Sequence, residues 1–160
     1  MIMKDNEIHV NLEAMLPVMQ EQLRAGGSFC FGPKGVSMLP LIHQGKDTVM
    51  IAPISGKLKK YDIPLYRRAN GQFVLHRVVA VRKDGYVMCG DNQYVREYGV
   101  KDEQLIGVLA EIRTPEKIIK VTDAEYKKYC KKRVRRQFVR GKLSVLKRRM
   151  KNYLNHVFRL

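Results

Sequence analysis

The sequence predicts a mainly β protein: a coiled antiparallel sheet body, preceded by a short helix and followed by basic helices. Many short apolar runs are separated by tight-turn signals, which is typical of an antiparallel β domain. Hydrophobic residues make up 45% of the 160 residues, enough for the core of one domain. The last third of the chain instead carries apolar residues at helical spacing between many bases. We therefore divide the chain into an N-terminal helical segment (1–27), a β domain (28–122) and a basic helical tail (123–160).

The N-terminal segment is expected to form an amphipathic helix over residues 9–25. Gly26 and Gly27 end the pattern, and Pro17 weakens it in the middle. The apolar positions that recur at helical spacing are Leu12, Met15, Leu16, Met19 and Leu23. The chain contains neither a secretory-type apolar core near its start nor an uncharged apolar stretch of about 18 residues. No transmembrane helix is therefore predicted.

The β domain contains seven runs that fit strands. Asn70-Gly71 separates two of them and is a strong hairpin signal, and Asp84-Gly85 marks a second tight turn. The expected strands are 28–31, 46–54, 62–68, 73–81, 86–90, 105–113 and 117–122.

The tail is predicted to form two basic amphipathic helices. Its apolar positions up to Phe138 follow helical spacing, Gly141 interrupts the pattern, and a 3-4-3-4 spacing then resumes from Leu143 to Val157. Residues 124–160 hold 14 of the 31 Lys and Arg residues but only one acid, Glu125, whereas the formal net charge of the whole chain is +16. The basicity is thus concentrated in the tail, which we expect to act separately from the body.

Three polar residues in the β domain are candidates for hydrolytic chemistry. Ser37 lies in the stretch GVSMLP, His76 lies among apolar residues of FVLHRVVAV, and Asp91 follows Gly90 across a hairpin from His76. A serine needs a base to become a nucleophile, and a histidine is commonly the base. Each residue alone also has an ordinary structural interpretation, as a turn serine, a packed histidine or a turn aspartate.

Taken together, five segments resemble one family. SMLP, the Gly45–Asp47 segment, DIPLY, LHRVV and GDN occur in the order seen in type I signal peptidases and related S24/S26-like serine peptidases, over roughly residues 28–113. The sequence is most similar to the endoplasmic-reticulum and sporulation type, in which histidine replaces lysine. The resemblance implies a signal-peptidase/LexA-like sheet, with Ser37 as nucleophile, His76 as general base and Asp91 as the residue that supports the site.

The sequence also departs from this family at several positions. Gly35 stands where a small hydroxyl residue often helps to bind the oxyanion, so we expect backbone N–H groups to do this. Gly35, Val36, Met38 and Pro40 are expected to form the loop that binds the oxyanion and the substrate. Tyr61 replaces the glycine that usually precedes the family's aspartate. Signal peptidases are anchored by transmembrane helices, and no such helix is predicted here.

The expected function is that of a serine endopeptidase, in which a Ser-His dyad supported by an aspartate cleaves a leader or signal-type peptide. No cofactor or metal is expected, because the three cysteines and four histidines lack metal-ligand spacing. The alternative is a DNA-associated or non-catalytic peptide-binding protein on the same LexA/signal-peptidase-like fold.

The basic tail predicts an anionic partner. Basic amphipathic helices suit an anionic membrane surface, which residues 124–160 are expected to bind peripherally. Nucleic acid is the rival partner, since Lys and Arg also neutralise phosphates, although the tail has no recognisable reader motif. Free cysteines and the absence of an export signal favour a cytoplasmic protein at the membrane.

Overall fold

The computed structural model describes residues 12–157, without the side chains of residues 152 and 155–157. The first positions of the helix expected over 9–25, and the last three residues of the tail, lie outside the described residues. The elements follow the chain in the order α1 (Leu12–Arg24), β1 (Phe29–Phe31), β2 (Thr48–Ala52), β3 (Pro64–Arg67), β4 (Phe73–Leu75), β5 (Arg77–Arg82), β6 (Gly85–Cys89), β7 (Glu97–Val100), the short 3-10 helix η1 (Asp102–Gln104), β8 (Leu105–Arg113), β9 (Ile118–Lys120) and α2 (Ala124–Val157).

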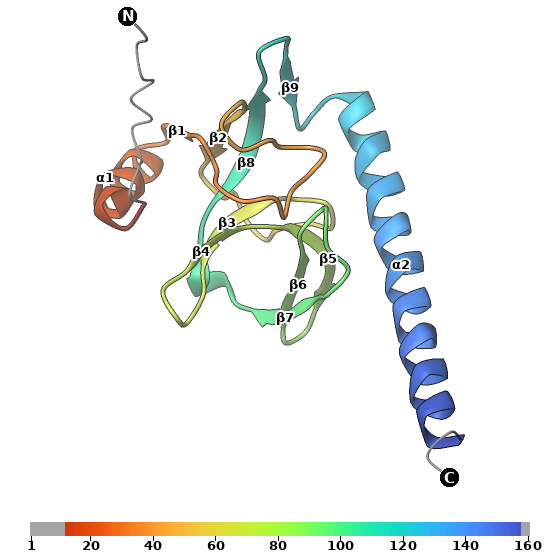
Figure 1. Cartoon of the computed structure of the whole chain (residues 1–160). Helices are drawn as coiled ribbons and strands as arrows, with labels where there is room; N and C mark the ends of the chain where they lie inside the picture. The colour runs from red at the N-terminus through yellow and green to blue at the C-terminus, as the bar shows by residue number, and fades with distance from the viewer. Residues whose placement is uncertain (1–11, 158–160) are drawn as a thin grey trace, which may run out of the picture.

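Within residues 12–157 the strands form two antiparallel sheets, which confirms the predicted mainly β class. The larger sheet has the order β1-β2-β8-β3-β4, with β9 paired to β8, and the smaller sheet has the order β5-β6-β7. In Figure 1 strands β3 to β7 curl around one side of the molecule, while α1 and α2 lie on opposite flanks. β1 and β4 lie at the ends of the larger sheet's main path.

The main hydrophobic core lies between α1 and the larger sheet. Met19 and Leu23 of α1 are buried, and they belong to the same cluster as Ile51 of β2 and Leu109 of β8. A Cβ on Gly107 would lie 2.4 Å from Cγ2 of Ile51, so this close strand contact requires glycine. The alternating burial of β2 explains why its sequence reads as a strand with one apolar face.

The segment expected to form one strand over residues 73–81 is divided at His76. β4 ends at Leu75 and pairs with β3 in the larger sheet, whereas β5 begins at Arg77 and pairs with β6 in the smaller sheet. The apolar run is continuous because both halves are buried, so its pattern gave no sign of the change of sheet. His76 therefore occupies the junction between the two sheets.

Strand β7 was not predicted from the sequence. Its four residues Glu97–Val100 contain an acid and a glycine, both uncommon in strands. Pairing with β6 brings Val100 opposite Tyr86 and Glu97 opposite Met88, so the strand is defined by its partner more than by its own composition.

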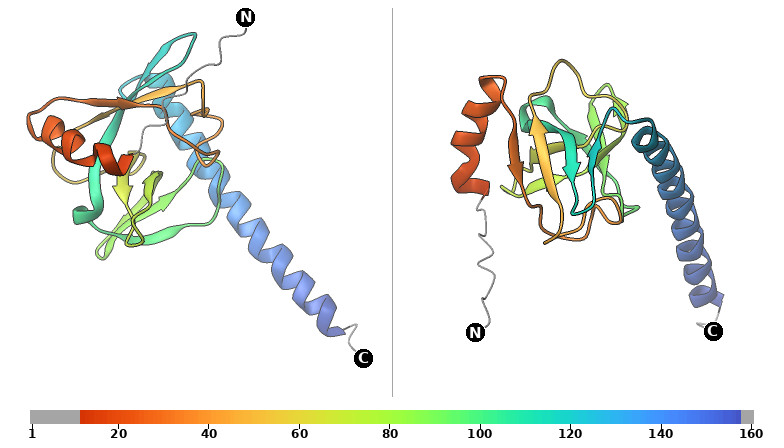
Figure 2. Two further views of the ribbon diagram at one scale, coloured as in Figure 1. Left: turned by 60° about the vertical axis from the view of Figure 1, so that its left-hand side comes forward. Right: turned by 90° about the horizontal axis from the view of Figure 1, so that it is seen from above.

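The basic tail forms one continuous helix, α2, and the prediction of two helices is wrong. Gly141 stays helical because a glycine costs a helix only about 1 kcal/mol relative to alanine. Tyr126 and Cys130, near the start of α2, are buried against the body, so the tail is not separate from the body along its whole length. Figure 2 shows the C-terminal half of the helix projecting away from the sheets. No helix within residues 12–157 is both long and apolar enough to cross a membrane.

Candidate functional site

Ser37 lies in the turn that follows β1, and the segment around Asn92 holds this turn in place. The backbone N–H of Asn92 donates a 2.7 Å hydrogen bond to the carbonyl of Ser37, and its side-chain amide donates to the carbonyl of Val36 at 3.2 Å. Met38 is buried, and its Sδ lies 3.5 Å from the backbone N of Asp91. The N–H of Ser37 donates no hydrogen bond within residues 12–157, so it is available to an incoming oxyanion.

His76 faces the same pocket as Ser37, with Gly90 between them. A Cβ built on Gly90 would lie 2.7 Å from the carbonyl oxygen of Ser37 and 3.0 Å from Nε2 of His76. Both groups therefore lie around the space that a side chain at position 90 would fill. His76 is only 6% exposed, and its ring contacts that of Tyr66 edge-on with centroids 6.5 Å apart.

The shared pocket has a volume of about 400 Å³ and opens between the Ser37 turn and edge strand β4. Its walls are formed by residues 33–38 on one side and residues 72–76 on the other, with Asn92 and Gln93 at the end. The structure thus brings the predicted serine and histidine together. Among residues 12–157, no three metal-ligating side chains come together in a cluster.

The imidazole of His76 is held neutral. Burial lowers its pKa from about 6.5 to about 4, and the positive charge of Arg68 acts in the same direction. The negative charges of Glu97 and Asp91 oppose this shift but do not cancel it. At neutral pH the ring is therefore unprotonated and able to accept a proton.

Asp91 does not contact His76 by a hydrogen bond, contrary to the role of an orienting partner. Its two carboxylate oxygens accept from Arg77, at 2.8 Å from Nε and 2.7 Å from Nη2, in a bidentate pair with both side chains fully buried. The hydroxyl of Tyr129 donates to the same carboxylate at 3.0 Å. Asp91 is therefore paired with Arg77 of β5, and no hydrogen bond joins it to His76. Asp91 is thus a positioning residue.

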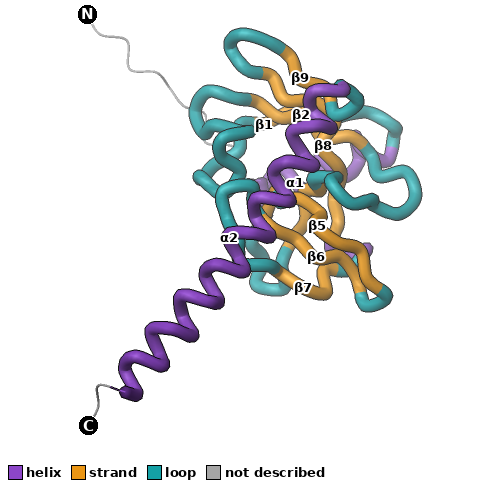
Figure 3. The backbone as a smooth tube through the Cα atoms, turned by 90° about the vertical axis from the view of Figure 1, so that its right-hand side faces the viewer, coloured by secondary structure: helices purple, strands orange, loops and turns teal. Residues whose placement is uncertain are grey.

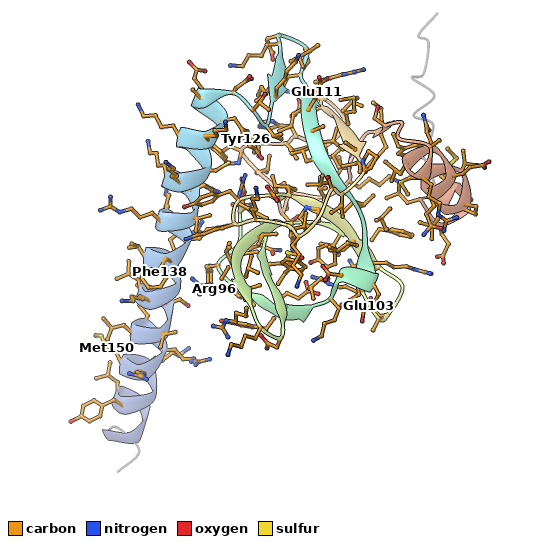
Figure 4. The ribbon with its side chains drawn as sticks, turned by 180° about the vertical axis from the view of Figure 1, so that it is seen from behind. Arg96, Glu103, Glu111, Tyr126, Phe138 and Met150 are labelled. Carbon is orange, nitrogen blue, oxygen red and sulfur yellow. The ribbon has the colours of Figure 1, made fainter. Side chains whose placement is uncertain are left out.

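Helix α2 completes the surroundings of Asp91. Nε of Arg133 donates to the backbone carbonyl of Asp91 at 2.6 Å, and Gln137 donates to that of Gly90 at 2.6 Å. The remaining guanidinium nitrogen of Arg77 donates to Sγ of Cys130 at 2.8 Å, with the hydroxyl of Tyr126 at 3.4 Å. Figure 4 shows Tyr126 pointing from α2 toward the body. The first half of α2 therefore holds the segment that carries Gly90 and Asp91.

Three residues near His76 were not singled out from the sequence. Arg68 forms hydrogen bonds to both carboxylate oxygens of Glu97, the shortest of them 2.6 Å, and the hydroxyl of Tyr66 donates to Glu97 at 2.7 Å. After burial, which has the largest effect on the pKa of His76, the charge of Arg68 lowers that pKa and the charge of Glu97 raises it. Because Arg68 and Glu97 lie 29 residues apart and Glu97 belongs to the unpredicted strand β7, no local pattern could have joined them.

Three of the four residues of the expected substrate-binding loop lie at this pocket. Gly35, Val36 and Met38 line the pocket, whereas Pro40 is exposed and is not among the described residues that line it. Gly35 has a φ of 94°, and a Cβ there would meet nothing within 4 Å, so backbone conformation is what favours glycine. Its N–H donates to Oε1 of Gln44 at 2.6 Å and is therefore not free for an oxyanion.

Tyr61 stands at the position where the resemblance leads one to expect a glycine. It adopts a φ of 87°, a conformation that normally requires glycine. Its backbone is held by hydrogen bonds, with its N–H donating to the carbonyl of Val78 at 2.8 Å and its carbonyl accepting from Arg77 at 3.1 Å. The position thus keeps the backbone geometry that favours glycine although a tyrosine occupies it.

Comparison with protein-family models, with curated proteins and with solved structures found no match to this chain.

Proposed function

We propose that this protein is a serine endopeptidase in which Ser37 is the nucleophile and His76 the general base. The single observation that carries the proposal is that Ser37 and a neutral His76 line one open pocket. A serine with a nearby neutral imidazole is the minimal arrangement for acyl transfer. Asp91 supports this dyad indirectly, by fixing Arg77 and the segment at Gly90.

In the proposed reaction, Oγ of Ser37 attacks the carbonyl carbon of the scissile bond while His76 takes the hydroxyl proton. The peptide C–N bond then breaks, and His76 returns that proton to the leaving amine. The free N–H of Ser37 donates to the oxyanion. Water attacks the resulting acyl-enzyme, with His76 again acting as base, and releases the acid product and free Ser37.

The proposed substrate is an extended polypeptide, of the leader or signal-peptide type that the family resemblance implies. β4 lies at one end of the larger sheet's main path, and residues 72–76 line the pocket. An extended peptide can therefore add to this edge by main-chain hydrogen bonds, with its scissile bond beside Ser37. A pocket of about 400 Å³ suits a short stretch of peptide with small side chains.

Comparison of protein N-termini tests the proposed activity. Cells that produce the wild-type protein should contain new N-termini that are absent when Ser37→Ala or His76→Ala is produced at the same level. Identical sets of N-termini in wild-type and Ser37→Ala cells would contradict the proposal.

A second observation favours peripheral association with an anionic membrane. The projecting part of α2 carries apolar side chains that are largely exposed, and a 3-4 spacing places them along one stripe. They are Val139 (48% exposed), Leu143 (51%), Leu146 (55%), Met150 (57%) and Tyr153 (70%). The stripe is flanked on both sides by bases, such as Arg140 and Lys142, and α2 has no acid after Glu125.

This charge pattern favours an anionic occupant of the stripe. A second copy of the helix would bring bases against bases, which is unfavourable. An anionic surface is complementary, because the apolar stripe can enter the acyl boundary while each nearby base contributes about 1 kcal/mol. The stripe is therefore proposed to bind lipid, and nucleic acid is the rival outcome of the test.

Vesicle co-sedimentation tests this association. Wild-type protein should sediment with vesicles containing phosphatidylserine at low salt, and Leu143→Glu/Met150→Glu should not. Leu143→Ser/Met150→Ser keeps the charge and should show an intermediate loss. Salt-dependent binding to duplex DNA, without binding to vesicles, would contradict the membrane proposal.

A further inference from the structure

A second open pocket lies between α2 and the segment that joins β6 to β7. Its volume is about 700 Å³, larger than that of the pocket at Ser37. Figure 3 shows α2 crossing the molecule beside β5, β6 and β7. One wall is formed by residues 94–96 and Tyr98 of the body. The other wall is formed by α2 residues that include Phe138, Lys142, Val145, Arg148 and Arg149.

The contacts across this pocket fix its two walls relative to each other. The guanidinium of Arg96 stacks on the ring of Phe138 at 5.6 Å, and these two side chains lie close together in Figure 4. The ammonium of Lys142 lies 4.7 Å from the same ring. Gly141 faces the carbonyl oxygen of Tyr94, which would lie 3.9 Å from a Cβ at position 141. An alanine at position 141 would therefore make only an ordinary van der Waals contact with the loop.

This pocket adjoins the candidate active site through shared lining residues. An intermediate hollow of about 660 Å³ shares Tyr94, Val95 and Arg96 with the pocket at α2. The same hollow shares Arg68 and His76, together with Asn92 and Gln93, with the pocket at Ser37. The three hollows therefore lie next to one another, from Ser37 past His76 to the outer part of α2, and we refer to them together as the track.

The lining of the track indicates what it would bind. At α2 the walls combine apolar side chains with Arg96, Lys142, Arg148 and Arg149, and no acid is among the described residues that line them. In the intermediate hollow the one carboxylate, that of Glu97, is already bound by Arg68. A segment with both apolar and acidic side chains is complementary to these walls.

We propose that the α2 pocket is an exosite that binds an apolar, acidic segment of the substrate polypeptide, at a distance from the bond cleaved at Ser37. The inference rests on the proposed peptidase function, because the occupant is taken to be the substrate. Remote binding of this kind raises the local concentration of the scissile bond at the nucleophile. It would select substrates by a feature outside the cleavage site.

Selection from a random dodecapeptide display library tests the exosite. The target is the full chain carrying Ser37→Ala, so that no peptide is cut. Enriched peptides should combine Asp or Glu with aliphatic or aromatic residues, and a synthetic peptide of the most enriched sequence is then the probe for affinity. Enrichment of peptides without acids would overturn the proposal.

Matched charge reversals on one helix separate the pocket from general electrostatics. Lys142→Glu/Arg149→Glu changes the pocket wall, whereas Lys147→Glu/Lys151→Glu makes the same charge change at positions that do not line it. The first pair should weaken binding of the synthetic peptide at least tenfold, and the second pair less than threefold. Equal losses in both would overturn the proposal.

Two further outcomes distinguish the exosite from the catalytic proposal. The bound peptide should shift the NMR signals of the His76 imidazole if the track is continuous, and unchanged signals would show that the pocket is not part of the same site. Wild-type protein that binds the selected peptides but cuts no longer polypeptide that carries them would contradict the peptidase alone. Cleavage that is independent of the Lys142 and Arg149 variants would contradict the exosite alone.

Discussion

At the scale of single residues, the site depends on Gly90, because a residue with a side chain would not fit at this position. Gly90 leaves the space in which the Ser37 carbonyl and the His76 imidazole approach each other, and its own carbonyl is held by Gln137. A glycine in a Gly-Asp-Asn sequence reads as an ordinary turn residue. Its importance follows from the approach of three separate segments, which the sequence does not display.

Gly90→Ala should abolish most of the activity while leaving the fold largely intact. The new methyl group would lie 2.7 Å and 3.0 Å from atoms that must not move, and displacement of a reacting group by about 1 Å can lower the rate about 100-fold. Peptide hydrolysis and thermal unfolding measure the two effects. Gly141→Ala is the control for thermal stability alone, because its Cβ would meet nothing closer than 3.9 Å, and this variant should raise stability by about 0.5–1 kcal/mol. Full activity in Gly90→Ala would disprove this geometry.

The low pKa of His76 predicts how activity depends on pH. Since the pKa is about 4, kcat/KM should stay level as pH falls through 6.5 and decline only near pH 4. Arg68→Gln removes a positive charge that lowers this pKa and frees the charge of Glu97, which raises it. The acid limb should therefore move to higher pH in that variant, and an unchanged limb would show that His76 is not the titrating base.

The same pKa makes a prediction about stability. In the unfolded chain the pKa of His76 is near 6.5, so between pH 6.5 and 4 the unfolded chain binds a proton at this residue and the folded protein does not. Stability should therefore fall as pH decreases through this window, by up to about 3 kcal/mol from this group. Urea unfolding of the wild type and of His76→Gln should show this component in the wild type only.

Asp91 illustrates a residue whose importance was predicted but whose contact was not. The order of the sequence segments identified it, yet its ion-pair partner is Arg77 and not His76. Asp91→Asn would leave a buried guanidinium without its counter-charge, which costs about 3–5 kcal/mol. Asp84→Asn, at an exposed turn, should change stability by less than about 0.5 kcal/mol. A stable but inactive Asp91→Asn would instead assign Asp91 to the chemistry of His76.

At the scale of elements, most strands were predictable and the joins between them were not. Alternating or continuous apolar runs located β8 and the β3–β4 hairpin, because these patterns depend on local burial. The break at His76 depends on which strands the two halves pair with, and pairing is a long-range property. The continuity of α2 was missed for a related reason: packing of its first half outweighs the small helix penalty of Gly141.

The two halves of α2 should differ in what their removal does. Ending the chain after Asp123 removes Tyr126, Cys130 and Gln137 from the body, so the buried charge of Arg77 and the carbonyl of Gly90 lose partners. This truncation should yield an unfolded or insoluble protein. Ending the chain after Arg140 should leave the body folded, with circular dichroism and a thermal midpoint near those of the full chain. Equal stability of both truncations would contradict a structural role for the first half.

At the scale of the whole molecule, three parts have different proposed roles: the curled sheet body, the half of α2 that packs against it, and the half of α2 that projects from it. The body carries Ser37 and His76, and the inner half of α2 holds the segment that contains Gly90. The outer half lines the α2 pocket and carries the exposed apolar stripe that is flanked by bases. The sequence predicted the body and the basicity of the tail. The sequence did not predict that one helix both packs against the body and projects from it, because the buried face of α2 includes the polar residues Arg133 and Gln137.

The central claim, that Ser37 attacks with His76 as its base, is tested most directly by digestion of a diverse synthetic peptide mixture followed by mass spectrometry. Wild-type protein should generate a reproducible set of cleavage products, while Ser37→Ala and His76→Ala, folded to the same thermal midpoint, should generate none above background. Products from Ser37→Ala at the wild-type rate would contradict the claim.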